Sequence, residues 1–154
     1  MNEDGPIVVA YDGSAAARAS IALAGVHLVK DREMLVLSVF QPIESVPFIG
    51  NPGVQIPDGM DDQIHAAVEK LAEEGAELGR KGGFDATGYV GPLHETVWQT
   101  IVRFADEHDA SVILMGTHGR SGVKAALLGS TASAVMHHAG RPVAVVPESY
   151  VTGS

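Results

Sequence analysis

Four glycines lie between residues 116 and 131, in the run GTHGRSGVKAALLGST, which follows an apolar stretch and precedes a helical pattern. Glycine lets main-chain N–H groups turn toward a bound anion without obstruction by a Cβ atom. Ser130 and Thr131 would then begin a helix, whose first amides are unpaired and carry the positive end of the helix dipole. The run therefore predicts an anion-binding loop. From the spacing alone, a long connection ending in a Ser/Thr cap remains an alternative.

Charged and titratable side chains in this loop could add to such a site. Arg120 and Lys124 could contact phosphate, although ordinary surface positions explain them equally well. His118 is an acid/base side chain, but no carboxylate lies beside it in sequence to orient it, so we expect a solvent-exposed histidine and no catalytic residue. The other histidines lack metal-ligand spacing and the chain has no cysteine, so we predict no metal site.

Composition narrows the class of protein. The 154 residues carry a net charge of −9, which argues against nucleic-acid binding. The apolar runs are too short to cross a bilayer, and the amino terminus does not resemble a secretory signal, so we expect a cytoplasmic protein without membrane insertion. The phosphate motifs G-x-x-x-x-G-K-[ST] and G-x-G-x-x-G and the nucleophile motif G-x-S-x-G are absent.

Strand and helix patterns alternate along the chain. Apolar runs indicate five strands, and helical patterns indicate four helices between them. The expected strands cover 7–10, 34–40, 84–90, 111–115 and 141–147; the helices run from Ser14 to Asp31-Arg32, over 61–80, from Pro92 to 109 and over 130–138. This alternation predicts one α/β domain over residues 1–154, a doubly wound, five-stranded parallel sheet with helices on both faces.

The position of the site fixes the expected strand order. Ligands of doubly wound sheets bind beyond the carboxyl ends of the strands, where the strand order reverses. Two loops are suited to such a site: the turn 11–14 after the first strand and the glycine loop after the fourth. If both serve one site, the first and fourth strands must be neighbours, which predicts the order 3-2-1-4-5. The proline-rich segment 41–59 is expected to be an irregular, mobile loop, and residues 149–154 a loose tail.

Three motifs in order resemble one family. Gly116-x2-Gly119-x9-Gly129-Ser130 matches the G-2x-G-9x-G-[S/T] motif of the ATP-binding branch of the universal stress proteins. Tyr11-Asp12-Gly13-Ser14 looks like the family's first-strand "DGS", and residues 141–147 look like its closing strand. The resemblance covers about residues 5–148 and implies a Rossmann-like fold of the adenine nucleotide alpha hydrolase type.

The resemblance also implies a function and a set of contacts. It implies a regulatory ATP-binding protein of the stress response, with Mg²⁺ accompanying the ATP, that forms a homodimer through strand 141–147. The implied nucleotide contacts, carried over by position, are Ala10, Tyr11, Asp12, Gly13, Val39, Met115, Gly116, Thr117, His118, Gly119, Arg120, Ser121, Gly122, Gly129, Ser130 and Thr131.

The family pattern assigns roles within this set. Gly116, Gly119 and residues 129–131 would cradle the phosphates, and residues 117–122 would form the wall of the loop. Asp12 and Gly13 would line the nucleoside end, and the backbone of Val39 would meet the adenine. Asp12 could contact the ribose, the base or Mg²⁺, or could be a turn residue that supports Gly13.

Other functions remain open at this point. One alternative is a slow ATPase or phosphotransferase, which the absence of a recognisable general base and of paired carboxylates in the loops disfavours. Another is a binder of a different adenine nucleotide, such as AMP or cyclic AMP. A third is an interaction protein without nucleotide, which the intact glycine motif disfavours. The sequence does not identify the regulated partner or process.

Overall fold

A computed structural model describes residues 2–42, 53, 56–118 and 128–150 of the chain. Five strands form one sheet: Ile7–Ala10 (β1), Glu33–Phe40 (β2), Asp85–Pro92 (β3), Val112–Gly116 (β4) and Val143–Val146 (β5). Their order is β3-β2-β1-β4-β5, and every neighbouring pair is parallel. The predicted order 3-2-1-4-5 is therefore confirmed, and the order reverses between β1 and β4.

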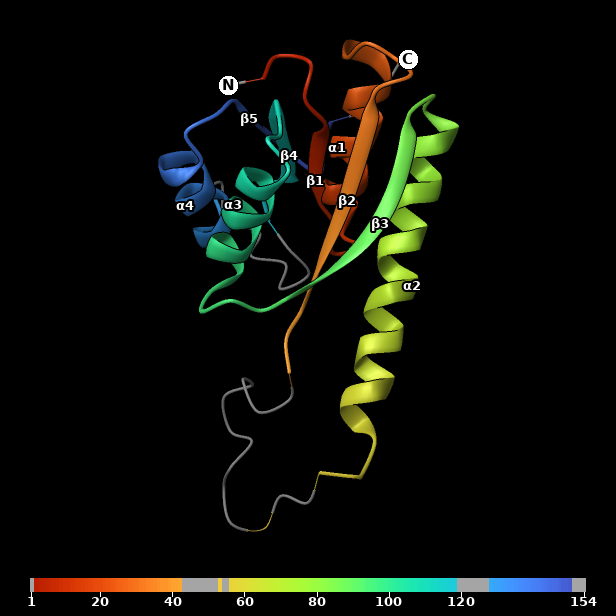
Figure 1. The fold of residues 1–154 in the computed structure, drawn as a ribbon, viewed down its shortest axis with the longest axis vertical. Coiled ribbons are helices and arrows are strands. Elements are labelled where there is room, and N and C mark those ends of the chain that lie inside the picture. The colour runs from red at the N-terminus through yellow and green to blue at the C-terminus, as the bar shows by residue number, and fades with distance from the viewer. Residues whose placement is uncertain (1, 43–52, 54–55, 119–127, 151–154) are drawn as a thin grey trace.

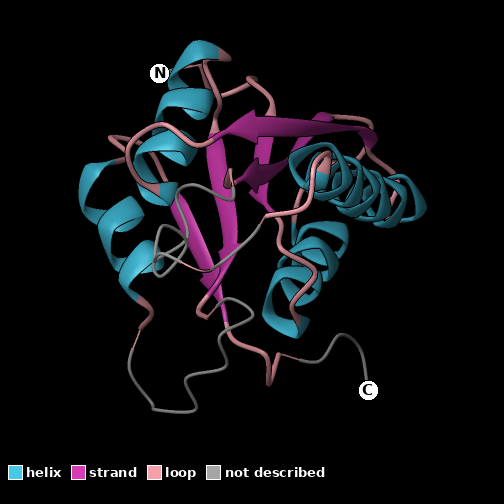
Figure 2. Cartoon of the chain, turned by 90° about the horizontal axis from the view of Figure 1, so that it is seen from below, coloured by secondary structure: helices cyan, strands magenta, loops and turns pink. Residues whose placement is uncertain are grey.

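Helices cover both faces of the sheet, as expected. Ala15–His27 (α1) and Met60–Lys81 (α2) lie on one face, and Val97–Glu107 (α3) and Ser130–His138 (α4) lie on the other (Figures 1 and 2). Successive residues of β1 point to opposite faces: Ile7 and Val9 pack in the core under α1 and α2, while Val8 packs in the core under α3 and α4. Burial on both faces explains why β1 is apolar at every position.

Two expected helix boundaries are wrong, the start of α3 and the end of α1. Pro92 does not open a helix; it ends β3, where it lies opposite Phe40 of β2. A proline is tolerated there because β3 is an edge strand, whose outer side needs no ladder hydrogen bond. Helix α3 begins five residues later, capped by Thr96, whose hydroxyl accepts the Gln99 N–H at 3.3 Å. Helix α1 ends at His27 rather than near Asp31, because Leu28 is already extended, with φ −102° and ψ 155°.

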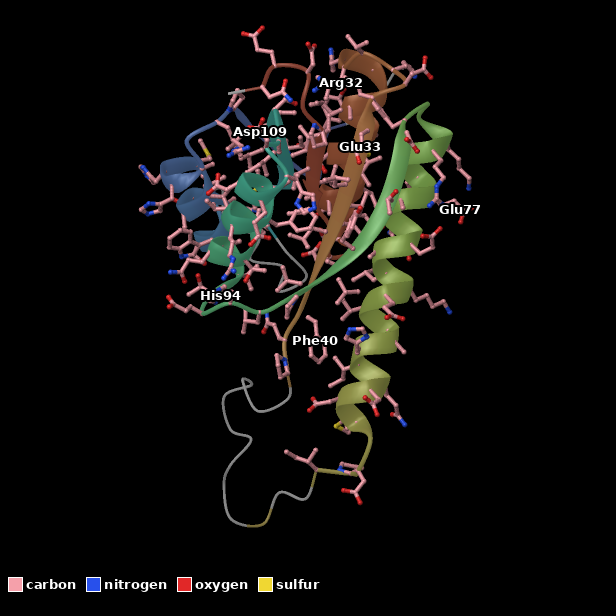
Figure 3. All side chains as sticks on the ribbon, in the orientation of Figure 1. Arg32, Glu33, Phe40, Glu77, His94 and Asp109 are labelled. Carbon is pink, nitrogen blue, oxygen red and sulfur yellow. The ribbon has the colours of Figure 1, made fainter. Side chains whose placement is uncertain are left out.

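Helix α2 lies close to the sheet because two of its buried positions are glycines. A Cβ atom at Gly75 would lie 2.7 Å from Cγ1 of Val36, and one at Gly79 would lie 2.8 Å from the sulfur of Met34. Toward its amino-terminal end the helix runs past the end of β2, where Phe40 lies (Figure 3). The ring of Phe40 meets that of His65 there, at 5.2 Å between centroids. Most of the segment 41–59 lies outside the described residues.

In the part of the chain that the structure describes, each helix is too short or too polar to cross a bilayer.

Candidate functional site

A cavity of about 560 Å³ opens at the carboxyl ends of β1, β2 and β4, where the strand order reverses. Figure 3 labels Phe40 and His94 at this end of the sheet, and Arg32, Glu33 and Asp109 at the opposite end. The described residues that line the cavity are Ala10, Tyr11, Asp12, Ser14, Ala17, Leu37, Ser38, Val39, Gln41, Leu71, Val97, Ile101, Met115, Gly116, Thr117, His118, Leu128, Gly129, Ser130, Thr131 and Ala132. The volume lies within the range of small-molecule sites, about 300–1,000 Å³.

The turn between β1 and α1 forms one wall. Oδ1 of Asp12 accepts the Ser14 N–H at 2.9 Å, and Oγ of Ser14 accepts the Ala17 N–H at 3.1 Å, which caps α1. Gly13 has a positive φ of 78°, a conformation that strongly favours glycine. Asp12 is thus a turn residue, as one hypothesis held, and it also lines the cavity. Gly13 shapes this turn but is not among the described lining residues.

The two ends of the glycine loop meet beside the sheet. The Thr117 N–H donates to the Val146 carbonyl at 3.0 Å, and the Gly129 N–H donates to the Thr117 carbonyl at 2.9 Å. A Cβ atom at Gly116 would lie 2.6 Å from Cβ of Ala16, and one at Gly129 would lie 2.7 Å from the Thr117 oxygen. Both glycines therefore allow parts of the protein itself to approach closely. The segment between them that contains Gly119, Arg120, Ser121, Gly122 and Lys124 lies outside the described residues.

The amino terminus of α4 forms a second wall. Its N-cap is Gly129, which has no side chain to cap the first turn, so the Ser/Thr cap of the alternative interpretation is wrong. Ser130, Thr131 and Ala132, the first three residues of the helix, all line the cavity. Main-chain amides in the first turn of a helix have no partner within the helix and bind anions readily. This wall is suited to a phosphate or carboxylate.

The rest of the cavity is lined mainly by apolar residues that the sequence analysis did not predict. The side chains at these positions come from β2, α2 and α3, and include Leu37, Leu71, Val97 and Ile101. In the sequence, these residues show the same periodic pattern as any core residue, so no local signal separates them from the core. Together with Val39 and Met115, they provide an apolar surface that could cover a flat aromatic ring.

A hydrogen-bond network fixes the end of β1 below the cavity. The Tyr11 hydroxyl donates to Oε1 of Glu74 at 2.6 Å, and Arg18 donates to the same oxygen at 3.0 Å, so α1 and α2 are joined at this point. The Ser38 hydroxyl donates to the Tyr11 carbonyl at 2.7 Å. Burial and the hydrogen bond with Glu74 raise the pKa of Tyr11, so its hydroxyl keeps its proton and acts as a donor.

His118 differs from the expectation. It is half-buried and lines the cavity, and its Nε2 atom is buried without a hydrogen-bond partner among the described residues, so the expected solvent-exposed histidine is wrong. The exposure of a loop side chain depends on its spatial neighbours, which the local sequence does not reveal. Across the described residues, no group of three or more His, Asp or Glu side chains is placed to hold a metal ion.

Comparison with known proteins identifies the family. The model of the universal stress protein family matches residues 5–147. The chain belongs to the universal stress protein family. A family member from Methanocaldococcus jannaschii is 31% identical over 145 residues, which cover 91% of this chain and 80% of the relative. The resemblance found in the sequence is confirmed at the level of the family.

Solved structures share the fold. The structure of a second M. jannaschii protein, MJ0577, aligns with a TM-score of 0.73 at 19% identity, covering 99% of this chain and 100% of the other. A universal stress protein from Archaeoglobus fulgidus in complex with dAMP aligns with a TM-score of 0.65 at 22% identity, covering 92% and 97%. Two further members, one in complex with cAMP and one from Arabidopsis thaliana with AMP bound, align with TM-scores of 0.59 and 0.60 at 21% and 13% identity. They cover 94% and 93% of this chain, and 98% and 91% of their own.

Proposed function

We propose that this universal stress protein binds ATP in the cavity between β1 and β4 and acts as a nucleotide-dependent regulator. The observation that carries the proposal is the shape of the cavity, which joins the uncapped amino terminus of α4 to an apolar pocket. A nucleotide needs both surfaces, one for its phosphates and one for its base. The adenine nucleotides bound by relatives of the same fold support the same ligand class.

The phosphates lie at the amino terminus of α4. The Gly129 N–H is already bonded to the Thr117 carbonyl, so the amides of Ser130, Thr131 and Ala132 are the donors available in this turn. Gly116 and Thr117 line the same cavity, and the family motif assigns residues 119–122, which lie outside the described residues, to the phosphate loop as well. The nucleoside lies between the ends of β1 and β2 and helix α3, against Val39, Val97 and Ile101.

Mg²⁺ would enter this site with the phosphates. No preformed cluster of acidic or histidine ligands exists among the described residues, so the ion would take most of its ligands from the nucleotide and from water. Asp12 is the carboxylate residue of the described cavity wall and would supply the protein ligand. The ion would neutralise phosphate charge beside the helix terminus.

A matched pair of variants at Thr131 tests the site. Thr131→Glu places a carboxylate in the first turn of α4, where it favours the helix by about 0.3–1 kcal/mol but repels phosphate. Thr131→Gln has nearly the same size without the charge. Saturating MgATP should raise the melting temperature of the wild type by about 5–10 °C, since ligand at a hundredfold excess over Kd adds about 2.7 kcal/mol. We expect Thr131→Gln to retain most of this shift and Thr131→Glu to lose it; an equal shift in both variants would place the ligand elsewhere.

The nucleotide carried by the purified protein identifies the ligand. Denaturation followed by ion-exchange chromatography of the supernatant separates ATP, ADP, AMP and cyclic AMP. ATP supports the proposal, AMP or cyclic AMP supports a different ligand in the same cavity, and ADP points to a slow ATPase. We expect phosphate release from MgATP far below the common enzyme rate of about 10 s⁻¹.

We also propose that the protein forms a homodimer through β5. This strand lies at an edge of the sheet, and Val143, Ala144 and Val145 are half-buried. An apolar edge strand offers unpaired main-chain groups to a second chain. Pairing through β5 would place two nucleotide sites in one assembly, which gives nucleotide occupancy a route to control what the dimer binds.

A further inference from the structure

Among the described residues of the cavity wall, His118 has a buried side-chain nitrogen without a hydrogen-bond partner. Within the described part of the chain, its Nε2 is the one buried side-chain nitrogen or oxygen without a hydrogen-bond partner. Buried polar groups in folded proteins nearly always have a partner, and an exception calls for an explanation such as a missing ligand or water. Nε2 is shut off from solvent in the free protein although another part of His118 lines the cavity, so a small turn of the ring would bring Nε2 to a ligand that enters the cavity.

The position of His118 indicates which ligand group this is. The residue follows Thr117, whose carbonyl accepts the Gly129 N–H at 2.9 Å. A Cβ atom built on Gly129 would lie 3.8 Å from Cα of His118, so the histidine begins beside the amino terminus of α4. The first three residues of that helix line the same cavity. An anion bound by the helix terminus would therefore lie within reach of the His118 side chain.

We infer that the Nε2–H of His118 donates a hydrogen bond to a phosphate oxygen of the bound nucleotide and makes the site selective for nucleotides over nucleosides. This inference rests on the proposed function. The other titratable side chains of the described wall hold structural bonds: the Tyr11 hydroxyl donates to Glu74, and Oδ1 of Asp12 accepts from Ser14. An imidazole N–H is a donor and phosphate oxygens are acceptors, so the pairing satisfies both groups.

The unsatisfied nitrogen gives a stability signature that needs no ligand. His118→Leu removes a buried polar group that lacks a partner, so the melting temperature of the nucleotide-free protein should rise by about 2–4 °C. The matched control is His108→Leu. His108 is also half-buried, but its Nδ1 lies 2.8 Å from the Phe104 carbonyl. Removal of that partnered nitrogen should lower the melting temperature by a similar amount.

The affinity of three ligands tests the role in binding. Isothermal titration calorimetry would measure ATP, AMP and adenosine against the wild type, His118→Leu and His118→Gln. We expect His118→Leu to weaken ATP and AMP by roughly 10- to 100-fold, the value of one hydrogen bond to a charged group, and to leave adenosine unchanged. Glutamine retains an N–H donor, so His118→Gln should stay within about threefold of the wild type.

The outcomes separate this inference from the function on which it rests. A wild type that binds none of the three ligands refutes the proposed function. A wild type that binds ATP with the same Kd as His118→Leu refutes this inference alone, as does an equal loss for adenosine and AMP. If His118→Leu fails to fold, the ring ¹⁵N signals of wild-type His118 decide: addition of AMP should shift Nε2, and an unchanged Nε2 signal contradicts the contact.

Discussion

Gly116→Ala should destabilise the protein because β4 and α1 are in direct contact at this position. A Cβ atom there would lie 2.6 Å from Cβ of Ala16 and 2.9 Å from both the Ala16 carbonyl carbon and the Ala17 nitrogen. The optimum for carbon–carbon contact is about 3.5–4.0 Å, so α1 and β4 must separate by close to an ångström. Two of these atoms are backbone, so no side-chain rotation relieves the contact. Overpacking of this kind costs about 1–3 kcal/mol.

Gly25→Ala is the matched control, because we expect it to stabilise the protein. Gly25 lies inside α1, and its added Cβ would meet its nearest neighbour, Cα of Gly82, at an ordinary 3.8 Å. Alanine favours a helix interior over glycine by about 0.8–1 kcal/mol. Thermal unfolding followed by circular dichroism should show Gly116→Ala melting roughly 2–10 °C below the wild type and Gly25→Ala about 2–4 °C above it. A Gly116→Ala protein as stable as the wild type would refute the close packing of α1 on β4.

Three further changes test other parts of the structure. Arg141→Met removes bonds to three main-chain carbonyls near the ends of α3 and α4 and to a carboxylate of α3, and urea titration should show a loss of about 2–4 kcal/mol. The pKa of Tyr11 is raised by burial and by Glu74, so its contribution to stability is present below about pH 10 and is lost as pH rises through the raised value. As the pH rises from about 9 to about 11, the free energy of unfolding should therefore fall less for Tyr11→Phe than for the wild type. Equal falls in the two proteins would contradict the buried hydroxyl. Val145→Lys should shift the mass in light scattering from two chains to one, and a wild type that is monomeric at micromolar concentration would refute the dimer.

Periodicity was sufficient to predict the sheet but not the boundary at Pro92. Runs such as 7–10 and 34–37 are apolar at every position, which indicates strands buried on both faces. A proline, however, is common both at the first position of a helix and at the end of an edge strand. The pairing of Pro92 with Phe40 decides between them, and that pairing joins residues 52 positions apart. Local sequence therefore could not place the start of α3.

The polar half of the candidate site was more predictable than the apolar half. Turn and helix-terminus residues such as Asp12 and Ser130 carry a local signal, because their types suit caps, turns and anions. Leu71 and Ile101 line the same cavity but belong to helices whose apolar stripes also pack on the sheet. Whether a stripe residue meets the core or a cavity depends on where its helix lies relative to the strand ends. That information is tertiary, so these residues were not predicted.

The glycines of the motif serve two different purposes, and this affects how their substitution can be interpreted. Gly129 has φ −59° and ψ 153°, an extended conformation that any residue adopts, so the position needs space rather than conformational freedom. The space is occupied by the Thr117 carbonyl, as the space beside Gly116 is occupied by α1. Substitution of either glycine would therefore distort the frame of the site as well as its contacts. Loss of nucleotide binding in such a variant would not identify a phosphate contact. The charge change at Thr131, with its neutral counterpart, alters the electrostatics of the helix terminus while leaving this frame intact, and so isolates the interaction proposed to hold the phosphates.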